Sequence, residues 1–314
     1  MLREHPLSNN SKLLPQPYVG RFAPSPSGPL HFGSLVCALA SFLHARQANG
    51  TWLVRIEDID TPRVDTSTIP IILDSLLAHG MQWDAQPIYQ SQRCEHYQHI
   101  INTLADKLEV YACKCSRKNI RARSEHYDQH CRDLNLPFKN YAVRWKNNIQ
   151  RTRFCDLHYG MLDISNHVVK EDPVLKRADG VYNYLLAVVA DDLEQQVTHV
   201  VRGADLIDTT PLQISFFEAL HAISPAYMHI PLAVDMHGQK LSKQQCAPAL
   251  DSHQAIHNLK NALVFLGLPA ATHSKIDNVD TLLNWAIEHW QPQLMGLQTE
   301  ILVSQTNGVY CTKN

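Results

Sequence analysis

The sequence predicts an α/β protein built around a parallel sheet. Residues 18–22 are typical of a short strand, apolar positions recur at helical spacing from Gly33, and residues 52–56 are typical of a second strand. A strand, a helix and a strand in this order form a βαβ unit, whose two strands lie parallel in one sheet. Ligands of such sheets bind at the carboxyl ends of the strands, where the loop after Phe22 and Glu57 both lie.

The remaining elements follow from local signals along the chain. Pro24, Pro26 and Pro29 lack N–H groups, so the first strand gives way to a stiff loop before the helix. Asn49-Gly50 is a helix stop signal. The continuous apolar run 181–190 predicts a buried strand. Further helices are predicted over 69–77, 94–110, 212–222, 254–266 and 281–290.

Composition indicates a globular protein of a reducing compartment. The 314 residues are 45% hydrophobic and 18% charged. No apolar run approaches the roughly 18 residues of a membrane span, so no membrane association is expected. Residues 1–17 are polar, lack the apolar stretch of a secretory signal and predict a flexible extension. Eight cysteines without such a signal favour free or metal-bound thiols and a cytoplasmic location.

The charge distribution is uneven although the net charge is only −2. Residues 111–153 hold eleven Lys and Arg against three Asp and Glu, a local balance of +8. A solvated basic face would explain this stretch by itself. A basic island in an otherwise acidic chain is better explained by a polyanionic partner such as nucleic acid.

Three cysteines in this stretch predict a metal site. Cys113-x-Cys115 and Cys131 provide soft thiolate ligands that favour tetrahedral zinc. The spacing is not a double Cys-x-x-Cys, and buried cysteines without a metal are the alternative. The chemistry leaves the fourth ligand open between His126, Tyr127, Asp128 and His130. The remaining cysteines are scattered and are expected to be core or surface thiols: Cys37, Cys94, Cys155, Cys246 and Cys311.

Two separated motifs predict a phosphate site. His31-x-Gly33 lies at a helix start, where unpaired N–H groups and the helix dipole attract phosphate. Residues 240–244 (KLSKQ) form a basic loop with two lysines. A lone histidine near a helix end is more often structural. Together, however, the two motifs can stabilise charge on a reacting phosphate, which predicts an enzyme that uses ATP.

These motifs resemble the signatures of class I aminoacyl-tRNA synthetases. Residues 21–34 (RFAPSPSGPLHFGS) resemble the first signature in its glutamyl/glutaminyl form, and residues 240–244 resemble the second. Residues 55–63 (RIEDIDTPR) and 201–205 (VRGAD) match the same group, so the resemblance runs from about 18 to 250. Three positions depart from the wider class: Ser34 replaces its second His, and Leu241 and Gln244 replace Met and Ser.

Within this class, the short chain and the cysteine pattern resemble the glutamyl-queuosine tRNA(Asp) synthetase family. Only about 70 residues follow Lys243, so we expect no anticodon-binding domain. The resemblance implies activation of L-glutamate by ATP with Mg²⁺, and transfer of glutamate to queuosine in the anticodon loop of tRNA(Asp). It also implies one Zn²⁺ per chain, with Tyr127 as the fourth ligand. We expect a monomer.

The resemblance carries site residues over position by position. A guanidinium such as that of Arg21 or Arg202 suits bidentate recognition of a carboxylate, and Glu57 would bind the substrate ammonium. His31 and Lys243 are implied as catalytic. The implied glutamate-binding residues are Arg21, Phe22, Ala23, Pro24, Ser25, Glu57, Tyr184 and Arg202. The implied ATP-binding residues are His31, Gly33, Ser34, Lys240, Ser242 and Lys243.

These interpretations divide the chain into five parts. The predicted parts are a flexible extension (1–17), two halves of a Rossmann-like catalytic domain (18–110 and 171–244), a basic zinc-binding insertion (111–170) and a mostly helical region (245–314).

Three other functions are compatible with the residues. A truncated glutamyl-tRNA synthetase would charge the 3′ end of tRNA(Glu). A zinc-containing RNA-binding protein would have an inactive core, and another nucleotidyl transferase would share the phosphate site. His31, Lys240 and Lys243 are all present, which favours an active enzyme.

Overall fold

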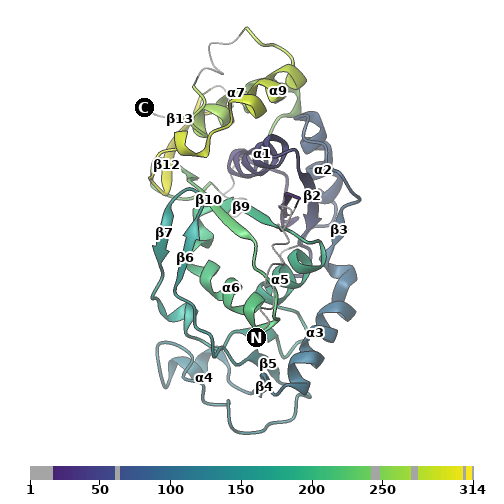
Figure 1. Ribbon diagram of the computed structural model, residues 1–314, viewed down its shortest axis with the longest axis vertical. Coiled ribbons are helices and arrows are strands. Elements are labelled where there is room, and N and C mark those ends of the chain that lie inside the picture. Colours follow the sequence, from purple (N-terminus) through teal and green to yellow (C-terminus); the bar gives the residue numbers. More distant parts are fainter. Residues whose placement is uncertain (1–16, 61–63, 242–247, 270–274, 307–308, 313–314) are drawn as a thin grey trace, which may run out of the picture.

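The computed structural model describes residues 17–60, 64–241, 248–269, 275–306 and 309–312 (Figure 1). Outside these ranges lie residues 1–16 of the predicted extension and Thr61, Pro62 and Arg63 of one motif. The predicted ATP-site residues Ser242 and Lys243, with Gln244 and Cys246, also lie outside them.

A seven-stranded sheet forms the centre of the molecule and confirms the predicted fold class. In spatial order its strands are β3 (Ile88–Tyr89), β2 (Thr51–Ile56), β1 (Val19–Phe22), β9 (His199–Gly203), β10 (Ala226–Ile230), β6 (Arg153–Asp156) and β7 (Gly160–Asp163). All neighbours pair parallel except β7, which runs antiparallel to β6. The βαβ unit predicted at the start of the chain is therefore confirmed.

The first helix, α1 (Phe32–Gln47), forms as its pattern predicts. Leu35, Leu39 and Leu43 are fully buried in the main core. The helix ends where Asn49 adopts a φ of 51° and the Gly50 N–H bonds the Ala45 carbonyl at 2.8 Å. The other helices around the large sheet are α2 (Thr68–Ala78), α3 (Cys94–Asp106), α5 (Tyr184–Glu194) and α6 (Thr210–Ala219).

One predicted strand is wrong, because most of the run 181–190 belongs to helix α5. The Asn183 side chain caps this helix by accepting from the Leu185 N–H at 3.0 Å. Residues 185–192 are all buried, so apolar side chains cover every side of the helix and no amphipathic period appears. An apolar run of this kind fits a buried strand and a buried helix equally well. The predicted helix 94–110 is also shorter, since Val110 already starts strand β4.

A small antiparallel sheet lies at one end of the molecule (lower end of Figure 1). It consists of β4 (Val110–Cys113), β5 (Ala142–Trp145) and β8 (Val174–Lys176), with the short helix α4 (Arg117–Arg121) beside it. Strands β6 and β7 come from the same part of the sequence but join the large sheet. The stretch 111–170 therefore contributes to both sheets.

The C-terminal region packs against α1 at the other end. Helices α7 (Ala255–Phe265) and α9 (Val279–His289) form where predicted, and Leu263 and Leu282 share the core of α1. A three-stranded sheet of β11 (Leu232–Val234), β12 (Glu300–Thr306) and β13 (Val309–Thr312) was not predicted. Short 3₁₀ turns are η2 (Gln90–Arg93), η3 (His167–Val169), η4 (Ala204–Thr209), η6 (Ser252–Gln254) and η7 (Pro292–Leu294). Within the described ranges, no helix has the length and apolar character needed to cross a bilayer.

Candidate active site and metal centre

A cavity of about 650 Å³ lies at the carboxyl ends of β1, β2, β9 and β10. It brings together every predicted glutamate- or ATP-site residue that falls within the described ranges. These are Arg21, Phe22, Ala23, Pro24, Ser25, His31, Gly33, Ser34, Glu57, Tyr184, Arg202 and Lys240. Residues separated by more than 200 positions in the sequence therefore face one space.

His31 is fixed at the start of helix α1 as its N-cap. Its Nδ1 accepts a hydrogen bond from the Ser34 N–H at 3.3 Å. A neutral imidazole that accepts at Nδ1 carries its proton on Nε2, so the ring has an Nε2–H donor. A Cβ on Gly33 would lie 3.1 Å from His31 Cε1 and 3.5 Å from the Leu241 carbonyl oxygen. Gly33 thus leaves room for the close approach of the imidazole and of the segment that carries Lys240.

Lys240 reaches the cavity from a turn that follows strand β11. The turn is closed by the Asp235 N–H bonding to the Gln239 carbonyl and by a bridge between Val234 and Lys240. The Lys240 ammonium forms an ion pair with Asp205, which also lines the cavity. Asp205 belongs to the quoted 201–205 motif, but no role was predicted for it.

Arg21 is buried and held by a carboxylate from helix α5. Its Nε and Nη2 groups donate to the two carboxylate oxygens of Asp192 at 3.1 and 3.4 Å. Asp192 also accepts from Arg55 Nη1 at 2.6 Å. Burial raises the pKa of Asp192, but the two guanidinium groups outweigh burial and keep that pKa below its usual value. Among the described residues, Arg21 Nη1 makes no hydrogen bond, which leaves a donor for a ligand.

Arg55 links this pair to two further acids. Its Nη2 and Nε groups are buried without a hydrogen bond, 3.7 Å from Glu57 Oε1 and 3.8 Å from Asp191 Oδ2. Asp191 accepts from Arg93 Nε at 2.6 Å and from Tyr97 at 2.9 Å. The buried acids are therefore compensated by cations of the protein itself.

The Glu57 carboxyl faces the cavity and is 10% exposed. Burial raises its pKa to about 7, and the nearby Arg55 and Arg21 only partly oppose that rise. A substrate ammonium at this place would favour the ionised form. Glu57 is therefore a pH-sensitive acceptor.

Arg202, the second predicted cation, is bonded differently from Arg21. Its guanidinium donates to Gln213 and to Thr210, each at 2.7 Å, and to His229 Nε2 at 3.1 Å. His229 Nδ1 is in turn 2.7 Å from Asp156. Most of the Arg202 donors are thus used within the protein, although the Arg202 side chain lines the cavity. Tyr184, at the first position of α5, is 40% exposed on the wall of the same cavity.

The sequence analysis missed the acids beneath the cavity, Asp191 and Asp192. They directly follow the run that was predicted to be a strand. In the helix, Asp191 and Asp192 are one or two turns from Tyr184 and Val188 and share their side of α5. Two adjacent acids at the end of a buried apolar run were the available signal, since buried carboxylates are rarely left unpaired.

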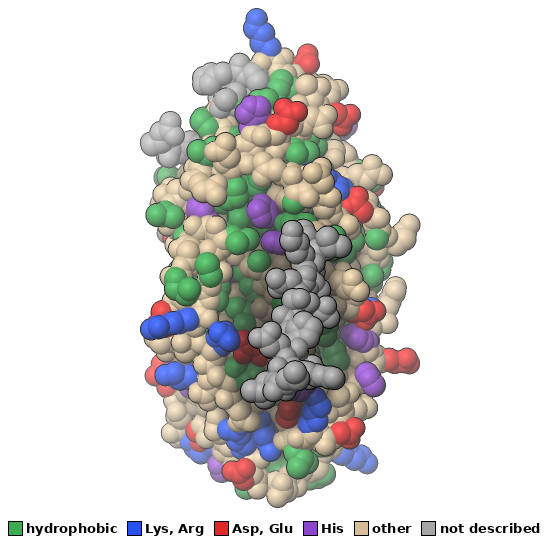
Figure 2. All heavy atoms as spheres, in the orientation of Figure 1, with side chains coloured by type: hydrophobic (Ala, Val, Ile, Leu, Met, Phe, Trp, Pro, Cys, Tyr) green, Lys and Arg blue, Asp and Glu red, His purple; other side chains and the backbone are tan. Residues whose placement is uncertain are grey.

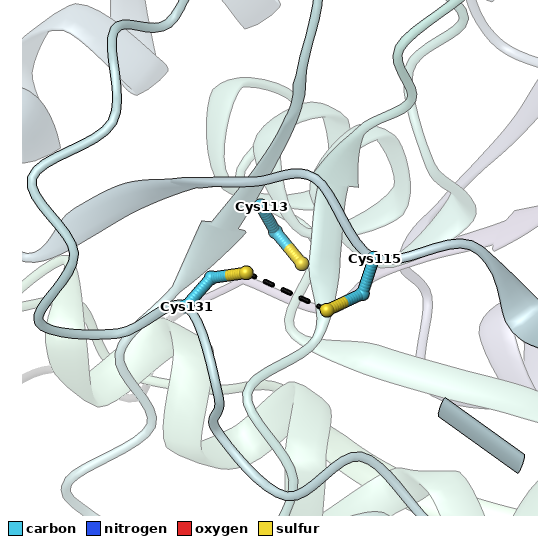
Figure 3. A group of neighbouring side chains, drawn as sticks. All are labelled: Cys113, Cys115 and Cys131. Carbon is cyan, nitrogen blue, oxygen red and sulfur yellow. Dashed lines mark hydrogen bonds between the residues drawn. The ribbon is translucent and has the colours of Figure 1, made fainter. Parts of the chain in front are cut away.

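Three cysteines converge beside the small sheet, as Figure 3 shows. The Cys115 and Cys131 sulfur atoms are 3.5 Å apart, which excludes a disulfide between them. Tetrahedral zinc with Zn–S bonds of about 2.3 Å places sulfur atoms roughly 3.8 Å apart. The Tyr127 oxygen lies 3.5 Å from Cys113 Sγ. The cluster is thus able to hold a metal.

Nearby arginines act on part of the cluster, whereas burial raises the pKa of the Cys131 thiol to about 11. Arg123 Nη2 donates to Cys115 Sγ at 3.2 Å, and the Arg144 guanidinium lies 3.6 Å from the centre of the Tyr127 ring. Burial raises the pKa of Cys113, yet hydrogen bonding with Tyr127 and the nearby Arg144 bring it below the ordinary value. His126, a rival for the fourth ligand, instead stacks on His167 at 3.4 Å between ring centres.

Part of the predicted basic stretch is an exposed cationic surface. Lys and Arg side chains are frequent over the lower half of the face in Figure 2, where Figure 1 places β4, β5 and α4. Four cations of this stretch are exposed and form no ion pair with another described residue: Lys114, Arg117, Lys118 and Arg121. Others are neutralised, for example Arg153 by Asp163 at 2.7 Å.

The fold and the cavity define the class of protein. Residues 18–265 match the family model described as tRNA synthetases class I (E and Q), catalytic domain, so the chain belongs to this class. Curated bacterial relatives named Glutamyl-Q tRNA(Asp) synthetase then specify the family. They are 44% identical over 291 residues in Vibrio parahaemolyticus (93% of this chain, 98% of the relative) and 46% identical over 273 residues in Idiomarina loihiensis (87% and 96%). The chain is therefore a member of the glutamyl-Q tRNA(Asp) synthetase family.

Solved structures agree with the fold. A glutamate tRNA ligase from Elizabethkingia meningosepticum matches with a TM-score of 0.74 at 23% identity. The match covers 90% of this chain and 66% of that ligase, so the chain spans about two thirds of its length. A glutamate-tRNA synthetase from Elizabethkingia anophelis matches equally well, with a TM-score of 0.74 and 67% of its length covered.

Proposed function

We propose that this chain activates L-glutamate with ATP to form glutamyl-adenylate, and then transfers the glutamyl group to queuosine in the anticodon loop of tRNA(Asp). The cavity is the observation that carries the proposal, because it combines a buried guanidinium, a carboxylate, a helix N-terminus and a lysine in one space. The family membership supports the same reaction.

Glutamate is recognised through complementary charges. Arg21 donates from Nη1 to the side-chain carboxylate while Asp192 fixes the other edge of the guanidinium. Glu57 accepts from the ammonium, and Tyr184 and Arg202 complete the wall. Glutamine cannot form the charge-assisted bonds, each worth about 1.5–3 kcal/mol, so its activation should be at least tenfold weaker.

The first step needs positioning rather than a base. An α-carboxylate oxygen of glutamate forms a bond to the α-phosphorus of ATP, and the bond from that phosphorus to the leaving pyrophosphate oxygen breaks. The carboxylate is ionised at neutral pH, so no proton has to be removed. The His31 Nε2–H, the N–H groups of the first α1 turn and Lys240 stabilise phosphate charge, and Lys243 is proposed to do the same. Mg²⁺ enters bound to ATP and neutralises part of that charge.

In the second step a hydroxyl oxygen of queuosine attacks the activated carbonyl carbon. The ester bond forms, AMP leaves, and the hydroxyl proton is lost to solvent or phosphate. The exposed cations Lys114, Arg117, Lys118 and Arg121 are proposed to contact the RNA backbone. One Zn²⁺ bound by Cys113, Cys115, Cys131 and Tyr127 is proposed to stabilise the insertion that presents these cations.

Two measurements test the proposal. Glutamate-dependent exchange between ATP and pyrophosphate should occur without RNA. Radiolabelled glutamate should then appear on tRNA(Asp) that contains queuosine, at the modified nucleotide when the product is mapped by nucleases. The same tRNA with unmodified guanosine should stay unlabelled.

The outcomes separate the competing functions. Label at the 3′ end of tRNA(Glu) would identify a short glutamyl-tRNA synthetase, and exchange without glutamate dependence would identify another nucleotidyl transferase. Absence of exchange would identify an inactive RNA-binding protein. Transfer should weaken as salt rises, whereas RNA-independent exchange should not.

A further inference from the structure

A second cavity, of about 440 Å³, lies between helix α3 and the small sheet. No residue within the described part of the chain lines both cavities. Its volume is within the range of about 300–1,000 Å³ that is typical of ligand sites. Nothing in the reaction described above uses this cavity, so its chemistry must be considered separately.

The lining combines cations with aromatic rings. Lys139, Lys176 and Arg177 supply positive charge, which Asp179 partly offsets through its ion pair with Arg177. The described residues that line the cavity itself include no Asp or Glu. Phe138, which is 47% exposed, and Tyr141 supply aromatic surface. Cations beside exposed aromatic faces are the chemistry with which proteins bind single-stranded nucleic acid, because phosphates pair with cations and bases stack on rings.

The Lys176 side chain is already held in place by contacts within the protein. Lys176 Nζ donates to Gln98 Oε1 at 2.8 Å and to the Tyr182 hydroxyl at 3.3 Å, and it lies 4.7 Å from the centre of the Tyr182 ring. Gln98 is fixed by a hydrogen bond from its Nε2 to Asn102 at 2.9 Å. A charge that is already oriented binds an anion at a lower entropic cost.

A short turn connects the two cavities. Lys176 forms a bridge with Tyr182, and the Arg177 N–H bonds the Val181 carbonyl at 2.8 Å. The Asn183 N–H bonds the Leu175 carbonyl at 2.8 Å, and the next residue, Tyr184, lines the active-site cavity. A ligand on Lys176 and Arg177 would therefore contact the turn that leads into Tyr184.

We propose that the second cavity binds one nucleotide of the RNA substrate, near but distinct from the nucleotide that enters the active site. Its base stacks on Phe138 and its phosphate is bound by Lys176 and Arg177. This inference rests on the proposed function, since it takes the RNA from there. Part of the RNA-binding surface would then lie in the turn that precedes Tyr184 of the glutamate site.

The stacking is tested at Phe138 by filter binding of radiolabelled tRNA(Asp) that contains queuosine. Phe138→Leu keeps apolar bulk but removes the aromatic face, and should weaken binding about tenfold. Phe138→Tyr keeps the face and should bind like the wild type. Leu134→Ala is the matched control, because Leu134 is 45% exposed in the same segment but does not line the cavity.

The phosphate contact is tested with two exposed Arg–Asp pairs. Arg177 pairs with Asp179 at 2.6 Å beside the cavity, and Arg153 pairs with Asp163 at 2.7 Å away from it. Arg177→Ala should weaken RNA binding several-fold and lower the slope of log affinity against log salt by about 0.7–0.9. Arg153→Ala should change neither value.

Exchange without RNA distinguishes the two proposals. It should be unchanged in all these variants, and wild-type exchange without labelling of queuosine would contradict the proposed function alone. Wild-type affinity in Phe138→Leu, equal losses in Arg177→Ala and Arg153→Ala, or no binding of the tRNA by the wild type would each overturn the nucleotide site. Loss of exchange in Phe138→Leu would also overturn it, since the residue would then act through the fold.

Discussion

The active-site cavity and the cysteine cluster both gather polar side chains inside the protein, but different partners compensate them. Beneath the cavity, buried Asp192 lies between the guanidinium groups of Arg21 and Arg55, so the protein supplies its own counter-charges. In the cluster, three thiols and a tyrosine oxygen converge, and Arg123, which donates to Cys115, is itself paired with Asp128. We therefore expect the cavity to be formed without a ligand, and the cluster to depend on a metal.

The largest effect is expected for Arg55→Met. The substitution leaves Asp192, Asp191 and Glu57 with one fewer cation in a buried space, which should lower the free energy of unfolding by about 3–5 kcal/mol. Urea denaturation measures this loss as a lower midpoint. Arg153→Met removes an exposed pair and should cost at most about 1 kcal/mol.

Equal stabilities of Arg55→Met and Arg153→Met would break the comparison, because the cavity would then not depend on its own charges. A double substitution sharpens it. Asp192→Asn added to Arg55→Met should cost less than the sum of the two single changes, since each removes the partner of the other.

The second prediction concerns the chemistry of the cavity. His31→Ala should slow glutamate-dependent exchange roughly a hundredfold, because a contact worth about 3 kcal/mol to the developing phosphate charge is lost. Lys243→Ala should have a similar effect. Steady-state exchange at saturating glutamate measures both.

His31→Ser separates catalysis from helix capping. Serine caps helices well, so this variant should keep the stability that His31→Ala loses, about 1 kcal/mol. Both variants should be equally slow in exchange. Recovery of exchange with serine would reduce His31 to a structural cap.

The third prediction tests the dependence of the cluster on metal. Removing a group that hydrogen-bonds to a metal ligand typically weakens metal affinity about 10–100-fold. Cys115→Ser removes a ligand itself, so it should weaken zinc affinity by more than this. Elemental analysis should find one zinc per wild-type chain and none in the variant after dialysis. Transfer to RNA should fall while exchange is nearly unchanged. Cys94→Ser, at an exposed cysteine outside the cluster, is the control.

Zinc-free wild-type protein from a purification without chelator would contradict this prediction. The fourth ligand has its own test. Tyr127→Phe should weaken zinc binding, whereas His126→Ala should not, because the His126 ring stacks on His167. The opposite result would move the fourth ligand to the histidine.

The sequence predicted which side chains meet at the cavity, because its motifs are short, local strings of residues. Arg21, His31 and Gly33 lie within one strand–loop–helix unit, so their proximity follows from the chain itself. The partner of Arg21 could not be predicted this way. Asp192 lies 171 residues away, on a helix that was predicted to be a strand.

Distance in the sequence also explains why the partners of Arg202 and the pairing of the C-terminal strands were not predicted. The partners of Arg202 are Gln213, Thr210 and His229, which meet only when α6 and β10 come together. Strand β12 pairs with β11, which lies more than 60 residues earlier, and no local period in the sequence specifies that pairing. Local patterns thus identified groups that line the cavity, but not the groups that hold them.

The smallest predicted effect sharpens the comparison through pH. The carboxyl of Glu57 has a pKa of about 7 in the folded protein against an ordinary value of 4.5, because burial outweighs the nearby arginines. Below pH ~7 the protonated group attracts the substrate ammonium less, so the KM for glutamate should rise up to about tenfold per pH unit as the pH falls.

The free energy of unfolding should increase as the pH falls, although glutamate binding weakens. The folded state binds the proton more tightly than the unfolded state, so the contribution of this group declines as the pH rises from 4.5 to about 7. Glu57→Gln should flatten both profiles. A wild-type KM that is constant over this range, or a Glu57→Gln variant that keeps the wild-type pH dependence, would show that Glu57 does not bind the ammonium.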